Sequence, residues 1–314
     1  MTAKQSKNFL LLFTAAVIWG VAFVAQSVGM DYVGPYTFNM VRTLLGGLVL
    51  IPCIFLLGRK NVRKDHDGSR SSQTFDRPRD LLIGGGLCGL MLFISTSLQQ
   101  VGIQYTTVGK AGFITALYII LVPILGIFLK RKPGLRIWIS VVIALVGLYL
   151  LCMTGSFSLS KGDFLILICS FCFSIHIMIV DHFSVKVSGT KLSCIQFFIS
   201  AALSAIPMFL LETPRMSNIL QAWLPILYAG IMSCGVAYTF QIIGQKGCDP
   251  TIASLILSLE SVVSVLAGWV ILHQSLSAKE ITGCVLMFAA IILAQVNPKK
   301  QGAGAESLNG ETVS

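Results

Sequence analysis

The stretch TIASLILSLESVVSVLAGWVIL, residues 251–272, carries one acid, Glu260, in a run that is otherwise uncharged. An α-helix of this length is long enough to cross the roughly 30 Å hydrocarbon core of a bilayer. Glu260 would then lie about 13 Å deep, near the midplane. Because a carboxylate persists at that depth only where it faces protein or water, Glu260 predicts a polar site inside a membrane-embedded bundle.

The composition of the whole chain agrees with a bilayer environment. Of its 314 residues, 55% are hydrophobic and only 11% are charged, against about 25% charged residues in soluble domains. Ten apolar segments have about the length of a spanning helix, and the sequence contains no ten-residue alternating strand pattern. We therefore predict an all-α membrane protein with ten transmembrane helices. The segments are 9–28, 36–57, 81–101, 111–129, 137–153, 162–180, 192–211, 223–243, 252–272 and 280–296.

The basic residues behind the net charge of +10 are distributed as expected for a membrane protein. With the N-terminus placed in the cytoplasm, 18 of the 23 Lys and Arg residues fall in cytoplasmic segments and 3 fall on the opposite side. This bias matches the positive-inside rule and predicts that both termini are cytoplasmic, in a multi-pass protein of the cell membrane. We therefore expect a small-molecule substrate and the lipid bilayer as partners, and no nucleic acid. The sequence leaves a homodimer open.

Internal symmetry divides the chain into two halves. A shift of 155 residues places Pro52 on Pro207, and a shift of 142 residues places Tyr118 on Glu260. Since each half has five helices, an odd number, the second half enters the membrane inverted, and inverted repeats place a substrate site near the midplane. We predict two inverted five-helix repeats with a solvated cytoplasmic loop and a disordered cytoplasmic tail. The ranges are 1–153 and 154–296 for the repeats, 58–79 for the loop and 297–314 for the tail.

The nine cysteines form no disulfide framework. Cys169 and Cys172 make a C-x-x-C within an apolar helix, but neither has a second ligand pair nearby in the sequence. We therefore expect no metal and no other cofactor.

Four stretches, in order along the chain, resemble the helix motifs of the EamA-type families of the drug/metabolite transporter superfamily. This resemblance implies two inverted five-helix repeats and secondary transport, often export, of amino acids, metabolites or drugs. Ser261 stands where the family usually has a proline after the acid of the ninth helix. The four stretches are AAVIWGVAFVA (15–25), RTLLGGL (42–48), TVGKAGFITALYIILVP (107–123) and LSLESVVSVLAGW (257–269).

Three candidate substrate-binding residues are expected near mid-depth. Glu260 would bind a proton or a cationic group, and Trp19, roughly 16 Å into the first helix, would form an aromatic wall. Tyr118 would add a hydroxyl on the fourth helix. If the repeat holds, Tyr118 and Glu260 should line one cavity beside Trp19. The alternatives are a buried structural acid, a packing Trp and a packing Tyr.

Two cations are expected above these residues, toward the outer mouth. Arg42 and Lys110 both start from the outer face. Together they would favour an anionic or zwitterionic solute whose amino group meets Glu260. Each could instead extend its charged end to the membrane surface, and Arg42 could also anchor Glu260.

The remaining candidates are weaker. His176 is either a proton relay or a packing residue, while Tyr238 and Gln241 would add polar contacts to the substrate. We therefore predict a secondary transporter of a small organic solute, an exporter that works by alternating access. The single deep acid leaves proton coupling, exchange and facilitated diffusion open.

Two other classes of function fit less well. A membrane-embedded enzyme acting on a lipid or small molecule is the alternative, but it needs a nucleophile–base or metal constellation at one depth. The four histidines are instead dispersed over different segments. A channel would show a filter-like repeat, which the sequence lacks.

Overall fold

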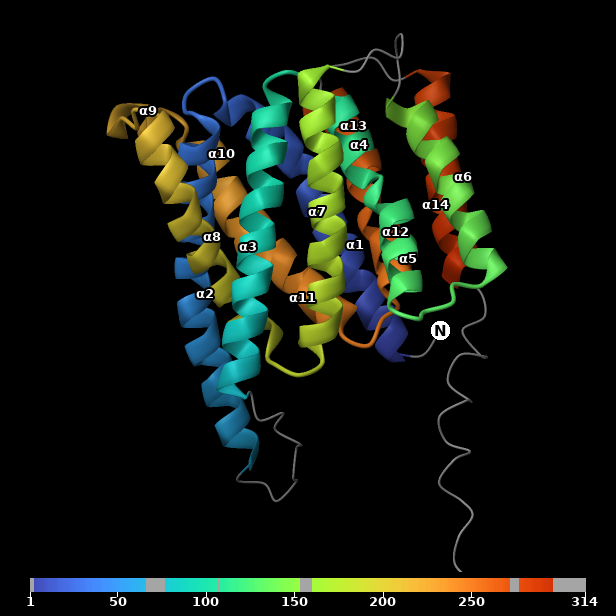
Figure 1. The fold of residues 1–314 in the computed structure, drawn as a ribbon, viewed down its shortest axis with the longest axis horizontal. Helices are drawn as coiled ribbons and strands as arrows, with labels where there is room; N and C mark the ends of the chain where they lie inside the picture. The colour runs from blue at the N-terminus through green and yellow to red at the C-terminus, as the bar shows by residue number, and fades with distance from the viewer. Residues whose placement is uncertain (1–2, 66–76, 107, 153–159, 272–276, 296–314) are drawn as a thin grey trace, which may run out of the picture.

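The computed structural model describes the whole chain apart from residues 1–2, 66–76, 107, 153–159, 272–276 and 296–314, and a few side chains that border these gaps. Within the described part, all regular structure is helical, and the long helices run side by side in one bundle (Figure 1). We call the end of the bundle at which α1 begins the N-terminal end, and the other the distal end.

Eight helical runs in the described part are long and apolar enough to cross a membrane, so the chain is a multi-pass membrane protein. They agree in place with eight of the ten predicted segments. They are α1 (Ala3–Gly29), α2 (Pro35–Asp65), α3 (Pro78–Ile103), α4 with α5 (Val108–Ala116, Tyr118–Phe128), α7 (Lys161–Ser184), α8 (Gly189–Leu211), α10 with η1 and α11 (Trp223–Leu227, Tyr228–Tyr238, Thr239–Gln245), and α12 with α13 (Pro250–Leu257, Leu259–Ile271).

The other two predicted segments form a pair at one side of the bundle. They are α6 (Leu135–Cys152) and α14 (Ala278–Gln295), which pack along each other at the right of Figure 1. Their helical state is confirmed, while their crossing of the bilayer stays a prediction.

Two features of the connections differ from the prediction. The first eight residues of the predicted loop 58–79 are helical, because α2 continues to Asp65. Lys and Arg are good helix formers, so a helix need not end where its apolar run ends. A short helix between α8 and α10, α9 (Met216–Gln221), was also not predicted. The predicted tail 297–314 lies outside the described residues.

The spanning helices are interrupted at three places near the middle of the bundle. At Leu117 the amide donates to the carbonyl of Ile114 (3.2 Å), and the amide of Ile120 donates to Leu117 (3.0 Å). The amide of Ser261 likewise donates to Ser258 (3.1 Å). These three hydrogen bonds span three residues, as in a 3₁₀ turn, which is tighter than an α-helix. The third interruption is η1, a π-helix, whose turns are wider than those of an α-helix. Such mid-helix departures often mark hinges and functional sites.

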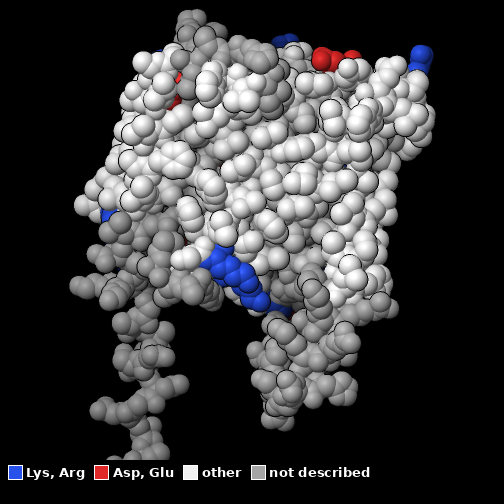
Figure 2. Space-filling model, turned by 180° about the vertical axis from the view of Figure 1, so that it is seen from behind, with Lys and Arg blue, Asp and Glu red and all other residues white. Residues whose placement is uncertain are grey.

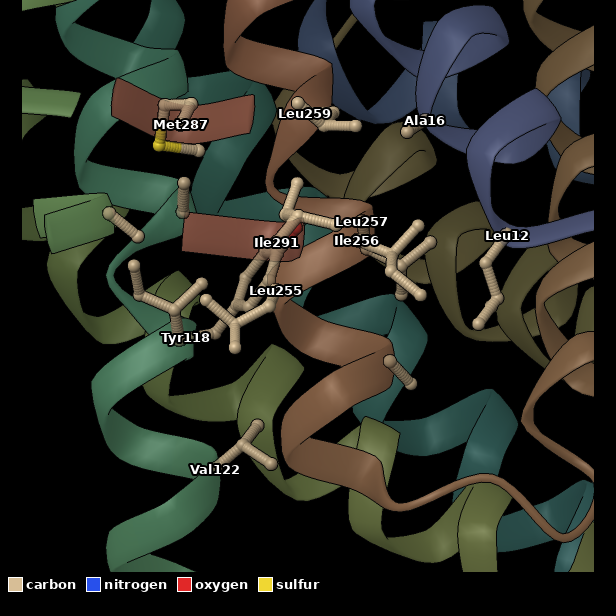
Figure 3. Packing of buried hydrophobic residues seen from close by; sticks show 14 of the residues in the cluster. Leu12, Ala16, Tyr118, Val122, Leu255, Ile256, Leu257, Leu259, Met287 and Ile291 are labelled. Atoms are coloured by element: carbon tan, nitrogen blue, oxygen red, sulfur yellow. The ribbon is translucent and has the colours of Figure 1, made fainter. Parts of the chain in front are cut away.

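The largest apolar cluster surrounds the break between α12 and α13. Figure 3 shows Leu257 and Leu259 on either side of this break, with Met287 of α14, Val122 of α5 and Leu12 of α1 around them. These side chains are buried. The cluster fixes the middle of the bundle, where lipid could not supply partners for the interrupted backbone.

The outside of the bundle suits a bilayer. Large apolar side chains such as Phe55, Phe128 and Leu210 are exposed. From the side shown in Figure 2, Lys, Arg, Asp and Glu lie mainly toward the two ends, with a broad uncharged band between. Lipid is as apolar as these side chains, so their exposure costs nothing there.

Candidate functional site

The helix breaks bring Tyr118 and Glu260 into direct contact. Tyr118 is the first residue of α5 and Glu260 is the second of α13. The Tyr118 hydroxyl donates a hydrogen bond to Oε1 of Glu260 at 3.0 Å, and both side chains are buried. The expected meeting of these two residues, 142 positions apart, is confirmed.

These two side chains line a cavity inside the bundle. Six of the eight predicted binding residues border it: Trp19, Arg42, Tyr118, Tyr238, Gln241 and Glu260. The remaining lining residues are Phe23, Gln26, Gln99, Thr115, Phe173, Ile177, Ser233 and Leu257.

The cavity extends from the helix breaks toward the distal end. Gln26 lies near the distal end of α1, Arg42 near the start of α2, and Gln99 near the end of α3. Since α1 and α3 end at the distal end and α2 begins there, all three place polar groups on that side of Glu260. The cavity is therefore polar in its distal half.

Arg42 is held inside the cavity. Its side chain is only 3% exposed, and its guanidinium lies over the ring of Phe38, 5.6 Å from the centroid. Nε has no hydrogen-bond partner among the described residues, and within that set no ion pair joins Arg42 to Glu260. The snorkelling alternative is thus wrong for this structure. A buried guanidinium with an unused N–H is suited to hold an anionic group.

Aromatic rings form one wall of the cavity. Trp19 and Tyr238 meet edge to face, with ring centroids 4.6 Å apart. The indole N–H of Trp19 points to the carbonyl of Ser233 in the π-helix, at 3.4 Å. Phe197 of α8 packs against the other side of Tyr238, with centroids 5.6 Å apart. Both rings that face the cavity are therefore fixed from behind.

His176 does not line the cavity. Its Nε2 lies 3.1 Å from Oε1 of Gln196 on α8, and its ring meets Tyr238 edge-on at 6.1 Å. On α7, Phe173 and Ile177 lie four residues apart and so share the face that borders the cavity. His176 comes one position before Ile177, about 100° around the helix, and faces α8 instead. His176 therefore packs behind Tyr238 and does not border the cavity, and its role as a proton relay stays a prediction.

The second predicted cation cannot be placed in the same way. Lys110 belongs to α4, but its side chain lies outside the described residues. Its predicted place above the cavity stays a prediction.

Two close contacts fix the backbone around Glu260. A Cβ added to Gly20 would lie 2.7 Å from the carbonyl oxygen of Glu260 and would overlap Val263, so α1 and α13 are in near backbone contact. Ser261, in the position where a proline was expected from the resemblance, donates its hydroxyl to the carbonyl of Gly112 in α4 at 3.0 Å. Glu260 is thereby held between α1 and α4.

Several buried polar atoms at the cavity have no protein partner. Oε1 of Gln26 and Oε1 of Gln241 accept no hydrogen bond from the described residues. Buried polar atoms are normally hydrogen-bonded, so these two oxygens are suited to a polar ligand or to water. The sequence did not single out Gln26, Phe173 or Ser233, because each carries no charge and lies in an ordinary apolar run.

Comparison with known proteins gives one consistent result. The model of the EamA-like transporter family matches two stretches of the chain, residues 6–153 and 160–295. A protein of Archaeoglobus fulgidus named as an uncharacterized transporter is 29% identical over 90% of this chain and 83% of its own. The uncharacterized transporter YoaV of Bacillus subtilis is 22% identical, over 91% of this chain and 96% of its own.

A solved structure shares the fold. It is titled only as the crystal structure of a protein, and it superposes with a TM-score of 0.73 at 20% sequence identity. The match covers 92% of this chain and 96% of that one.

Proposed function

The chain belongs to the EamA-like transporter family, and from this premise we propose that it is a secondary transporter that exports a small zwitterionic solute by alternating access. The proposal depends on one observation: Arg42 and Glu260 line the same cavity, yet no ion pair joins them in the described part of the chain. An unpaired cation and a lone acid, both buried, are costly unless a ligand completes them.

The arrangement of the two groups favours a solute that carries both charges. Arg42 would hold its carboxylate in the distal half of the cavity, and Glu260, kept in place by Tyr118, would meet its amino group. Trp19, Phe173 and Tyr238 would cover an apolar or aromatic body.

Three observations support alternating access between two repeats. The family model matches two successive stretches of the chain. Helices α2 and α8, which correspond under the shift of 155, pack together, as do α6 and α14. Two discontinuous helices, α4–α5 and α12–α13, meet at the cavity, as in transporters that bind near the midplane. We propose that the N-terminal end faces the cytoplasm, as the positive charges suggest.

The test uses three solutes that share one skeleton. Phenylalanine carries both charges, phenethylamine only the amine, and hydrocinnamate only the carboxylate. Purified protein in proteoliposomes should move labelled phenylalanine faster than either analogue. Arg42→Gln should reduce the flux of phenylalanine without improving that of hydrocinnamate. Flux of none of the three, in protein shown to be folded, would contradict the proposal for the substrate. Conversion of any of them to a product would favour an enzyme.

A further inference from the structure

Helix α5 joins the cavity to the N-terminal end of the bundle. It is 11 residues long, about 16 Å, and it begins at Tyr118 beside Glu260. It is separated from α4 by the tight turn at Leu117. A short helix with an interruption at one end can tilt as a unit about that point.

The far end of α5 is fastened to another helix by charge. Arg131, three residues past the end of α5, forms an ion pair with Asp181 in the last turn of α7, at the N-terminal end of the bundle. The carboxylate is mostly buried and the guanidinium is partly exposed. Helix α7 packs extensively on α3, and α5 packs along α7, so the ion pair fastens the end of α5 to the helix on which α5 already lies.

The backbone is bent so that Arg131 can reach this partner. Lys130 adopts a left-handed conformation, with φ of 61°, which costs a residue other than glycine about 1 kcal/mol or more. The amide of Arg131 then donates to the carbonyl of Gly126 at 2.9 Å, which completes a Schellman-type helix end. The side chain of Arg131 lies over Gly126, where an added Cβ would be in ordinary van der Waals contact with it at 3.7 Å. A strained residue persists where the surrounding contacts hold it.

We propose that α5 is the gate of the cavity at the N-terminal end, latched to α7 by Arg131 and Asp181 and coupled to the solute through Tyr118. The turn at Leu117 is the hinge. A solute amine first meets Glu260 while Tyr118 still holds it; loss of the Tyr118 hydrogen bond in a second step frees one end of α5, and opening of the ion pair frees the other. The gate rests on the alternating access proposed above.

The gate can be tested without any solute. Hydrogen–deuterium exchange is measured by mass spectrometry on the full-length protein in lipid nanodiscs. Asp181→Asn and Arg131→Gln should each speed exchange over residues 118–128 about fivefold, the effect of losing a partly exposed ion pair. The reversed pair, Arg131→Asp with Asp181→Arg, should restore slow exchange. Tyr118→Phe should also speed exchange at the far turn of α5, residues 124–128, if the helix moves as one unit.

The matched control removes a contact at the same end of the bundle, but one that joins two residues at the end of α7 and does not involve α5. Lys186 contacts His182 at 2.7 Å, and Lys186→Gln should leave exchange in α5 unchanged. Wild-type exchange of α5 in Asp181→Asn would overturn the gate, as would an equal rise in Lys186→Gln. Since these results do not depend on flux, they can contradict the gate without contradicting the proposed transport. Absence of flux together with the expected exchange pattern would contradict the proposed transport and support the gate.

Discussion

The hydroxyl of Tyr118 and the carboxylate of Glu260, 142 residues apart in sequence, are joined by a hydrogen bond of 3.0 Å inside the bundle. Each follows an interruption of its own helix, so each is the first polar side chain that the renewed helix presents. Tyr118 bonds Oε1, and no hydrogen bond from the described residues reaches Oε2 of Glu260. Glu260 is thus oriented by the protein and still able to take a ligand.

We predict that Glu260→Gln will keep the fold and lose transport. The amide can still accept the bond from Tyr118, so the free energy of unfolding should change by only about 1 kcal/mol. Flux of phenylalanine in proteoliposomes should fall at least about tenfold, because a neutral group cannot pair with the solute amine. Thermal unfolding of the purified variant controls for folding. Wild-type flux in well-folded Glu260→Gln would return this acid to a structural role.

Gly20→Ala should separate α1 from α13. The new Cβ would lie 2.7 Å from the carbonyl oxygen of Glu260 and would overlap Val263, and backbone cannot yield as a flexible side chain can. We expect a loss of stability of about 1–3 kcal/mol, measured by thermal unfolding in detergent. Gly86→Ala in α3 is the matched control, since nothing lies within 4 Å of its added Cβ, and it should be neutral or slightly stabilising. Equal stability of the two variants would contradict the close contact.

The contact of His176 with Gln196 should behave as a structural pair. Gln196→Leu leaves a buried imidazole without its partner and should cost about 1–3 kcal/mol. The double variant His176→Leu with Gln196→Leu removes both polar groups and should recover most of that loss. Thermal unfolding of the two singles and the double gives the interaction energy. If flux disappears in the folded double variant, His176 has a role in transport beyond packing.

The charge bias predicts the orientation of the chain. A protease site inserted between residues 66 and 76 should be cut from the cytoplasmic side only, because seven Lys and Arg residues gather in the 58–79 segment. The measurement compares inside-out vesicles with intact cells. Cleavage in intact cells by added protease would reverse the proposed topology.

Two residues of the site could be predicted from their depth in the membrane alone. Trp19 and Glu260 stand out because an indole far from the headgroups and an acid near the midplane each need an explanation in lipid. Tyr118 followed from the shift of 142, which carries it onto Glu260. Long apolar runs gave the helices for the same reason, since a spanning segment must satisfy its backbone internally.

Other parts of the site required the fold. Gln26 and Phe173 are ordinary members of their helices, and only the packing of α1 and α7 turns them toward the cavity. His176 and Ile177 are adjacent in sequence, yet His176 faces α8 and Ile177 faces the cavity. The sequence of α7 alone does not show which of its faces borders the cavity. The turns at Leu117 and Ser258 contain no Gly or Pro, so the sequence contains no signal that predicts an interruption of either helix.

The π-helix η1 has a consequence for how the length of this chain can vary. A residue removed from a regular α-helix rotates everything beyond it by about 100°. The wide turns of η1 instead hold residues in excess of the α repeat, so a one-residue deletion within 228–238 can be absorbed by closing a wide turn to an α turn. Gln241 in the following helix would then keep its direction toward the cavity. Proteins of this fold that differ by one residue in length have, in this span, a place where the difference does not disturb the ligand-facing side.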